Sequence, residues 1–486
     1  MLSTAAIAWL PWRAESFARA RAEGRPVLLS IAPTWCSNSA EMDTATFADS
    51  EVAAVTAAHF VAIRVDPDRR PDIAERYSLG GWPTTAFLTP DGDVLGGGTF
   101  IERRRLADVL RRVSAAFAPA RDLRPARVLS PVVASAETVP SERLIDLVAA
   151  AFDSRHGGFG DAPKFPHAAP VKLALELYRE RGSPAHRDIA VTTLDAMGWG
   201  AIYDEQDGGF CRCARRADWG EPSGEKLLDV NASLLDLYLD AAETLELGRY
   251  LERAADILRY VQSWLADQAD GGWAGSQRAE TAHADGDDRV SGRPAPPIDR
   301  TLYTDWNAMM ASAAIKAGRA LDDPSLSEFA IRSLERIAML CYRPGAGMAH
   351  YHDGEAQVRG LLDDQIAMAA AQLDAFEATG NIVYEMLAEE LALHAANFMW
   401  DGDSGGFFDR IADEANDVGL LGERRKPFAG NCAAARLLDR LGRIANKPRY
   451  RELAERTLSA IGPRAAGEGH LAADYVLAVR AAGQRP

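Results

Sequence analysis

The sequence predicts a multidomain chain in which an N-terminal α/β domain is followed by an all-α domain. Strand-length apolar runs alternate with helical stretches over residues 1–118, whereas apolar residues from 141 to 486 recur at helical spacing almost without interruption. Between these parts, residues 119–140 contain four prolines and show no clear period, as is typical of linkers. We therefore expect one domain over 1–118, a linker over 119–140 and a second domain over 141–486.

The N-terminal part contains three apolar runs of strand length and the turn sequence Pro90-Asp-Gly-Asp. A helix is expected between the first two strands, and a glycine-rich strand and a closing helix are expected after the turn. In chain order these elements are a strand over 25–32, a helix over 39–58, strands over 60–66, 84–88 and 94–100, and a helix over 101–117.

Composition narrows the class of protein. Hydrophobic residues make up 47% and charged residues 26% of the 486 positions, which is enough apolar matter for a large core. The net charge of −16, with no basic stripe, argues against nucleic acid or a lipid surface as partner. No apolar run reaches the roughly 18 residues that a membrane helix needs. Five scattered cysteines and no signal-peptide pattern lead us to expect a cytoplasmic protein with reduced thiols and no cofactor.

A short motif recurs four times in the helical part: an aspartate, three variable residues, two glycines and an aromatic residue. The copies begin at Asp153, Asp204, Asp267 and Asp401, and residues 341–347 resemble a decayed fifth copy. Glycines permit left-handed turns after helices, and the aromatic side chain can fill the space between helical hairpins. The motif therefore marks the loops of a helical repeat.

The same part contains twelve helical segments. Twelve helices are what a closed ring of six helical hairpins requires, so we expect an (α/α)6 toroid, with an open helical solenoid as the alternative. The segments begin near Ser141, Val171, Asp188, Lys226, Tyr250, Asp305, Leu326, Asp363, Val383, Phe428, Arg449 and His470.

The N-terminal domain places one cysteine between a strand and a helix, in the sequence Trp35-Cys36-Ser-Asn-Ser39. This is the position of a Cys-x-x-Cys redox motif, and a helix start stabilises a thiolate. About 45 residues later, Trp82-Pro83 stands just before a strand, where a thioredoxin-like fold has a cis-proline loop opposite the thiol. We therefore predict a thioredoxin-like fold with Trp35, Trp82 and Pro83 bordering the site.

The expected chemistry of this site is limited by its single thiol. A dithiol reductase needs a second cysteine to resolve the mixed disulfide, and Ser39 stands in its place. Two interpretations stay open. Cys36 is either a nucleophile that forms mixed disulfides with protein thiols, or the remnant of a site retained for packing.

The centre of a toroid can also hold a small sugar-like molecule between acidic side chains. Glu225 and Asp229 are candidates for acid and base at one helix start, and Asp305 opens another helix. Each acid has helix capping as its alternative. We expect Asp305 to be structural and the other two acids to face the cavity.

Neighbouring polar and aromatic residues are further candidates for substrate contacts. Trp219 and Trp306 could stack on a sugar ring, although buried aromatic residues are commoner. Asn307 follows Trp306 at the same helix start, and Lys164 lies in a polar loop as a contact, an ion-pair anchor or a loop clamp.

No metal site is expected. His350-Tyr-His352 has ligand-like spacing on an extended segment, which we interpret as a surface loop. Cys211 and Cys213 would face one side of an extended chain, but no second pair at zinc spacing completes a site.

Taken together, these motifs resemble the spermatogenesis-associated protein 20 family over nearly the whole chain. The resemblance implies a thioredoxin-like domain on a six-hairpin glycosidase-like toroid, similar to N-acylglucosamine epimerases. The family usually has Cys-His-Trp-Cys where Cys36-Ser-Asn-Ser39 stands, and a histidine where Ser223 stands. The matching segments are Trp9-Leu-Pro-Trp12, Glu15-Ser-Phe17, 25–31, Trp35-Cys36, 60–66, 70–73, Gly81-Trp-Pro83, 157–166, Tyr203-Asp204, Gly209-Phe210, 224–228, Asp305-Trp-Asn307 and Gly430-Asn431.

Three functions remain open from the sequence. The first is a thioredoxin-like protein with a single thiol at Cys36 that acts on protein thiols. The second is a carbohydrate-binding or sugar-isomerising toroid, which a pair of histidines in the toroid loops would favour. The third is a non-catalytic interaction protein.

Overall fold

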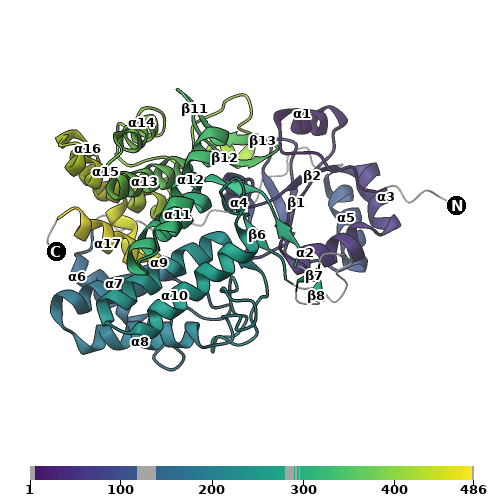
Figure 1. Cartoon of the computed structure of the whole chain (residues 1–486). Coiled ribbons are helices and arrows are strands. Elements are labelled where there is room, and N and C mark those ends of the chain that lie inside the picture. Colours follow the sequence, from purple (N-terminus) through teal and green to yellow (C-terminus); the bar gives the residue numbers. More distant parts are fainter. Residues whose placement is uncertain (1–5, 118–137, 280–288, 291–292, 295, 484–486) are drawn as a thin grey trace. The chain divides into compact units, whose positions relative to one another are not determined.

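A computed structural model describes residues 6–117, 138–279, 289–290, 293–294 and 296–483 (Figure 1). The chain folds as two compact units, one made of residues 1–131 with 412–424, and the other of 132–411 with 425–486. Most of the expected linker over 119–140 lies outside the described residues. The first unit also takes up the segment 412–424, which corrects the expected domain over 141–486.

The first unit contains a four-stranded sheet in the order β2-β1-β3-β4. Strand β1 pairs parallel to β2 and antiparallel to β3, and β3 pairs antiparallel to β4. The four strands match the expected runs, with bounds β1 Val27–Ile31, β2 Val61–Val65, β3 Thr84–Leu88 and β4 Val94–Gly98. This mixed sheet confirms the α/β class of the N-terminal part.

Helices cover both faces of this sheet, which is why every residue of β1 and β3 is buried. On one face α1 and α4 contribute Phe17 and Ile73 to the core, and on the other α3 and α5 contribute Val52 and Leu106. The expected helix over 39–58 is broken at Asp49, whose carboxylate caps α3. The helices are α1 Ala14–Glu23, α2 Ser37–Glu41 with a π-helical continuation Met42–Phe47, α3 Ser50–His59, α4 Pro71–Tyr77 and α5 Arg103–Phe117.

The segment 412–424 completes the core of the first unit. Leu421 is 1% exposed and packs in the same apolar cluster as Phe17 and Tyr77. The Arg76 guanidinium donates to the carbonyls of Leu420 and Glu423 at 3.0 and 2.7 Å. This apolar and polar contact fixes the segment to α4, although the sequence places it more than 300 positions away.

The second unit contains the twelve expected helices. The inner helices α7, α9, α11, α13, α15 and α17 each contact the next, and α17 contacts α7, so the ring is closed. Helices α8, α10, α12, α14 and α16 pack outside, and α6 packs against α17. This closed ring of six hairpins confirms the (α/α)6 toroid. The bounds are α6 Ser141–Ala150, α7 Ala168–Arg181, α8 Pro184–Gly198, α9 Leu228–Leu245, α10 Gly248–Tyr260, α11 Thr304–Ala320, α12 Pro324–Cys341, α13 Leu362–Thr379, α14 Ile382–Phe398, α15 Phe428–Ile444, α16 Pro448–Ile461 and α17 Ala473–Ala481.

The four repeated motifs form tight loops that are closed in the same way. In each loop the aspartate backbone N–H donates to the carbonyl of the second glycine at 2.9 to 3.0 Å. A buried or half-buried cation from another segment then bonds to the aspartate side chain and to a nearby backbone carbonyl. These cations are Lys164 for Asp153, Lys226 for Asp204, Arg336 for Asp267 and Lys426 for Asp401.

An amide side chain near the start of an inner helix fastens three of these loops. Asn307 shows the arrangement: its Oδ1 accepts from the Trp273 N–H at 2.8 Å, and its Nδ2 donates to the carbonyls of Trp273 and Tyr303. Asn231 holds Phe210 and Asn431 holds Phe407 in the same manner. Gln365 holds Met348 likewise, so the segment after residues 341–347 occupies the place of a repeat copy.

Short strands accompany the loops of the toroid, which the helical periodicity did not predict. The longest form the hairpin β12 Gly347–Asp353 and β13 Glu355–Arg359, and β10 Leu302–Tyr303 pairs with β12. The remaining ones are β5 Lys226–Leu227, β6 Ser276–Gln277, β7 Arg289–Val290, β8 Arg293–Pro294, β9 Ile298–Asp299 and β11 Tyr342–Arg343.

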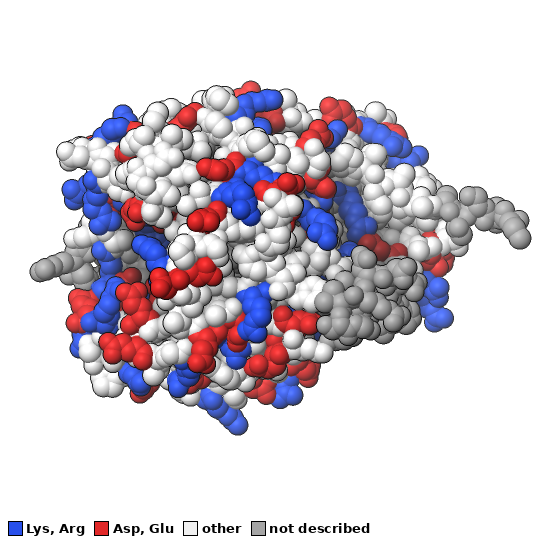
Figure 2. Space-filling model, in the orientation of Figure 1, with Lys and Arg blue, Asp and Glu red and all other residues white. Residues whose placement is uncertain are grey.

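Charges of both signs are interspersed over the face shown in Figure 2, without a basic stripe among its described residues. Across the described residues, no helix combines the length and the apolar character that crossing a bilayer requires.

Candidate functional site

The inner helices all begin at one end of the ring. Inner and outer helices alternate along the chain, so successive inner helices run in the same direction. We call this end the rim, defined by the first residues of the inner helices, Ala168, Leu228, Thr304, Leu362, Phe428 and Ala473. The candidate side chains of the toroid lie at or next to the rim.

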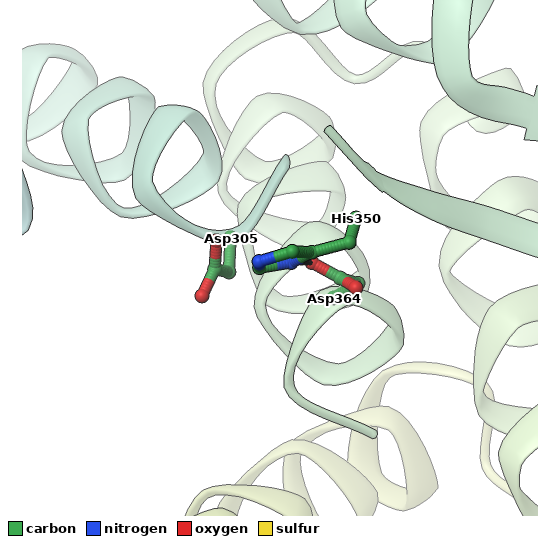
Figure 3. Close-up of side chains that lie close together, drawn as sticks. All are labelled: Asp305, His350 and Asp364. Carbon is green, nitrogen blue, oxygen red and sulfur yellow. Dashed lines mark hydrogen bonds and ion pairs between the residues drawn. The ribbon is translucent and has the colours of Figure 1, made fainter. Parts of the chain in front are cut away.

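Three titratable side chains meet at the seam between α11 and α13. Asp305 lies in the first turn of α11, Asp364 in the first turn of α13, and His350 on β12. One potential ligand atom from each lies within 4.8 Å of the others. His350 Nδ1 is hydrogen-bonded to Asp364 Oδ1 at 2.9 Å, and Figure 3 shows the imidazole between the two carboxyl groups.

Backbone contacts of the two residues before His350 fix its position. The Thr304 hydroxyl at the start of α11 donates to the carbonyl of Ala349 at 2.6 Å. Gln365 at the start of α13 bonds to both backbone groups of Met348. Because the two β12 residues that precede His350 are bonded to the two helices that carry the acids, the cluster is held by its surroundings.

Burial gives this cluster unusual electrostatics. His350 is 3% exposed and Asp364 is fully buried, with its Oδ2 bonded to no group of the described chain. Burial, together with the Asp364 and Asp363 carboxylates, raises the pKa of Asp305 far above its usual range, and His350 partly offsets this. A carboxyl group of raised pKa beside a carboxylate-oriented imidazole can transfer protons near neutral pH. The same three side chains are also of a type that binds divalent cations.

These observations bear on the expectation for Asp305 and overturn the one for His350. Asp305 does not cap α11, because its carboxylate accepts only the N–H of the adjacent Trp306 and faces the cluster. His350 is not in a surface loop, because it lies on β12 and is 3% exposed, whereas His352, further along the same strand, is only half-buried. The His-x-His pattern could not predict this difference, because residues two apart on a strand face the same side.

The acids expected to face the cavity lie at the start of α9. Glu225 is 4% exposed and accepts a hydrogen bond from the Arg212 Nε at 2.8 Å, so an arginine neutralises it. Burial raises the pKa of Asp229 to about 6, and its Oδ1 is bonded to no described group. Asp229 is therefore the acid of this pair that is suited to proton transfer.

A pair of histidines lies at the seam between α7 and α17. His167 precedes α7 and His470 lies just before α17, and their ring centroids are 4.7 Å apart. Burial and the neighbouring His470 lower the pKa of His167 to about 4, and burial also lowers the pKa of His470. Both imidazoles are therefore neutral at pH 7. Sequence reasoning missed this pair because ring closure alone brings the two positions together.

Three predicted contact residues instead hold the loops of the ring. The Lys164 ammonium is fully buried and bonds to Asp153 at 2.6 Å, which makes it a loop clamp. Asn307 uses both ends of its amide on backbone groups. Trp219 is 2% exposed, and its indole N–H donates to the carbonyl of His156 at 3.1 Å. These contacts give all three residues a structural role, which for Lys164 is the loop clamp that the sequence left open.

Trp306 differs from these three residues. It is half-buried next to Asp305, and its ring packs against Tyr303 at 4.6 Å between centroids. It therefore stays a candidate for contact with a ligand at the rim.

In the first unit, Cys36 immediately precedes α2 and is 9% exposed. Ser39 lies one turn further, is 2% exposed, and has a hydroxyl bonded to no described group. The Trp82–Pro83 peptide is cis, as expected for the loop before β3. The indole N–H of Trp35 donates to Asp68 at 2.6 Å, which fixes the residue before the thiol.

All five cysteines are buried, and none of them forms a disulfide. Burial raises the pKa of Cys211 and of Cys341 to about 11, and it also raises the pKa of Cys213 and of Cys432. These thiols are poor nucleophiles near neutral pH.

Comparison with known proteins is consistent with both units. Residues 2–126 match the family Thioredox_DsbH, described as a protein of unknown function, DUF255. An uncharacterised protein of Caenorhabditis elegans, B0495.5, is 23% identical over 94% of this chain and 81% of its own length. Human spermatogenesis-associated protein 20 is 28% identical over 56% of this chain and 39% of its own length. The chain thus spans about two fifths of that protein.

Solved structures resemble the toroid in fold. Cellobiose 2-epimerase from Bacillus thermoamylovorans B4167 has a TM-score of 0.54 at 10% identity, covering 66% of this chain and 86% of that one. Cellobiose 2-epimerase from Spirochaeta thermophila DSM 6192 has a TM-score of 0.53 at 16% identity, covering 65% and 81%. At these identities the likeness shows the fold alone.

The N-terminal match and the similar proteins together show which known proteins this chain is related to. It carries an N-terminal Thioredox_DsbH (DUF255) domain on an (α/α)6 toroid, and it is homologous to spermatogenesis-associated protein 20.

Proposed function

We propose that the toroid binds a sugar-like polyhydroxylated molecule at its rim and transfers protons to and from it, as an isomerase or epimerase does. The observation that carries this proposal is the Asp305, His350 and Asp364 cluster, in which a carboxyl group of raised pKa adjoins an imidazole oriented by a buried carboxylate.

A second group of proton carriers supports this reaction class. In ring order the seam between α11 and α13 lies opposite the seam between α17 and α7, which holds His167 and His470. A molecule in the mouth of the ring would therefore have proton carriers on two opposite sides. This is what removal of a proton from one face of a carbon and its return to the other requires.

The proton transfer balances without a co-reactant. A neutral imidazole takes the proton from the carbon next to the carbonyl of an open-chain sugar, and the electron pair moves to the carbonyl oxygen, which Asp305 protonates. The resulting enediol regains a carbon-bound proton while its hydroxyl proton leaves, so a sugar isomer forms.

Deuterium exchange tests the proposal. The protein is incubated in D2O with a panel of aldoses and ketoses, and deuterium at the carbon next to the carbonyl is measured by NMR. We expect incorporation with at least one sugar, and a loss of about 100-fold or more in Asp305→Asn and in His350→Asn.

The matched control is Asp322→Asn, an exposed aspartate just beyond the other end of α11, which should exchange like the unmodified protein. Exchange that persists unchanged in both cluster variants would refute the assignment. Binding of a sugar without exchange in any variant would leave a carbohydrate-binding protein.

We further propose that Cys36 forms mixed disulfides with protein thiols and does not act as a dithiol reductase. Its support is the position of the thiol directly before α2, the cis-Pro83 peptide before β3, and Ser39 where a resolving thiol would stand. The Cys36 thiolate attacks a disulfide sulfur and the second sulfur leaves as a thiolate, so no external oxidant is needed.

A gain of function tests this second proposal. With glutathione disulfide, the protein should form a stable adduct at Cys36 and none in Cys36→Ser, as read by mass spectrometry. Ser39→Cys should release the adduct by forming an internal disulfide. If neither the thiol nor the toroid cluster is active, both units serve as interaction surfaces for other proteins.

A further inference from the structure

A polar cavity lies inside the ring, further along the inner helices than the rim. It has a volume of about 430 Å³ and is lined by residues of α7, α9, α11, α13 and α15. The space exists because alanines face it from three helices, Ala232, Ala313, Ala367 and Ala370 among them, where larger side chains would fill the axis. We call it the axial cavity.

Four cations and two carboxylates line the axial cavity. The two lysines, Lys172 and Lys316, are compensated within the protein. Both bond to Asp236, and Lys316 also bonds to Asp240 at 2.6 Å. The second lining carboxylate, Asp374, pairs with Arg440 behind it at 2.8 Å. These groups neutralise one another.

The two arginines of the lining remain. Arg436 has Asp474 as its nearest carboxylate at 3.8 Å, which is longer than a hydrogen bond. Within the described part of the chain, no carboxylate lies within ion-pair distance of Arg319. A guanidinium that lines a cavity without a close carboxylate is suited to binding an anionic ligand. Two of its N–H groups can donate side by side to the two oxygens of a carboxylate or phosphate.

A second cavity offers a path to these arginines. It has a volume of about 710 Å³, lies near the C-terminal ends of α9 and α11, and shares Lys316 and Arg319 with the axial cavity. The C-terminal ends of the inner helices lie opposite the rim. A ligand could therefore reach the axial cavity without passing the Asp305 cluster.

We propose that the axial cavity binds a small organic anion, carrying a phosphate or carboxylate group, between Arg319 and Arg436. The lysines and aspartates around Asp236 form a fixed polar wall, and the Met309 side chain and the alanines contribute an apolar one. This mixture of a few directed charges with apolar walls is typical of small-molecule sites of this size. The site is distinct from the proposed proton-transfer site at the rim.

Calorimetry on the full chain at physiological ionic strength tests this proposal. The probes are inorganic phosphate, citrate and glucose 6-phosphate, with glucose as the uncharged comparison. We expect at least one of the three anions to bind, and glucose not to bind with comparable affinity. The three anions distinguish two kinds of ligand. Binding of citrate alone indicates a site for carboxylates, and binding of glucose 6-phosphate indicates a site for a phosphorylated molecule.

Charge-removing variants locate the site. Arg319→Gln and Arg436→Gln should each weaken anion binding about tenfold or more, as loss of a charge-assisted pair predicts. Arg436→Lys should bind with intermediate affinity, which keeps the test valid if the glutamine variant folds poorly. Arg179→Gln is the matched control, since Arg179 is exposed near the end of α7 and should change nothing.

The proposal fails if none of the three anions binds, if glucose binds as tightly as glucose 6-phosphate, or if Arg179→Gln weakens binding as much as the cavity variants. Asp305→Asn should leave anion binding intact. If that variant abolishes it, the anion occupies the rim and the axial assignment is wrong.

Discussion

The phenol oxygen of Tyr77 accepts a hydrogen bond from the backbone N–H of Leu420 at 2.8 Å and donates one to the carbonyl of Gly92 at the same distance. One hydroxyl thus joins the thioredoxin-like domain to a segment 343 positions later in the chain. A Cβ at Gly419, which has a φ of +61°, would lie 2.4 Å from this oxygen, so the contact requires glycine there. Cutting the chain within 119–140 would therefore not yield an intact first domain.

Removing the apolar part of this contact should destabilise the thioredoxin-like domain. Leu421→Ala deletes a side chain that is 1% exposed, which typically costs about 2–5 kcal/mol. Urea unfolding should show the loss in the transition of the first unit. Glu414→Ala, an exposed change in the same segment, is the control. A fragment of residues 1–131 should melt lower than the intact domain and be stabilised by a peptide of residues 412–424.

Replacing an amide side chain that fastens a loop should lower the free energy of unfolding more than replacing an exposed amide side chain does. Asn307→Ala removes three hydrogen bonds and leaves buried backbone groups of Trp273 and Tyr303 without their partner, at about 1–3 kcal/mol. Chemical unfolding of the toroid measures this cost. Gln206→Ala, an exposed loop change, should fall within about 0.5 kcal/mol of the unmodified protein. Equal effects would contradict the loop-fastening role.

The raised pKa of Asp229 predicts that this carboxyl group destabilises the folded protein as the pH rises. With a pKa of about 6 in the folded protein against 3.8 for the free group, the folded state holds its proton more tightly than the unfolded state. Stability contributed by this group is therefore lost as pH rises from about 4 to 6. Asp229→Asn should be more stable than the unmodified protein at pH 8 by roughly 1–3 kcal/mol, and should lose this advantage near pH 4.

The measurement is thermal unfolding at both pH values, with Asp322→Asn as the exposed control that should show no such difference. If Asp229→Asn is the less stable protein at pH 8, the carboxylate has a partner that stabilises its charged form.

Alkylation should single out Cys36. Burial raises the pKa of the other four thiols, to about 11 for Cys211 and Cys341, so little thiolate forms there at pH 8. Brief treatment with iodoacetamide and peptide mass spectrometry should find Cys36 modified first. Cys36→Ser should then react slowly at every position. Faster modification of Cys341 would count against Cys36 as the most reactive thiol.

The sequence revealed the architecture because local patterns encode it. The strand runs, the twelve helical segments and the glycine loops each extend over a few residues, and the structure confirms them. The position of Pro83 before β3 likewise followed from its neighbours. The β12–β13 hairpin was missed because its alternation is short and lies between two strong helical patterns.

The candidate sites were harder to predict because they depend on ring order. Asp305, His350 and Asp364 come from a helix, a strand and a second helix, and the strand is brought to the first helix by the β10–β12 pairing and by the Thr304 hydrogen bond to Ala349. His167 and His470 meet only where α17 returns to α7. Motif reasoning chose Glu225 from its helix-start position, but it could not show that Arg212 neutralises this carboxylate.

The amide side chains that fasten the loops also bear on the order of folding. Asn231, Asn307 and Asn431 bond to groups only 21, 34 and 24 positions away, so each hairpin can close by itself at little cost in chain entropy. Closure of the ring joins Arg480 to Glu176 across 304 positions. The seam of α7 and α17 is thus expected to be the late, slow step of folding, with φ-values near zero, and the histidine pair exists only once that step is complete.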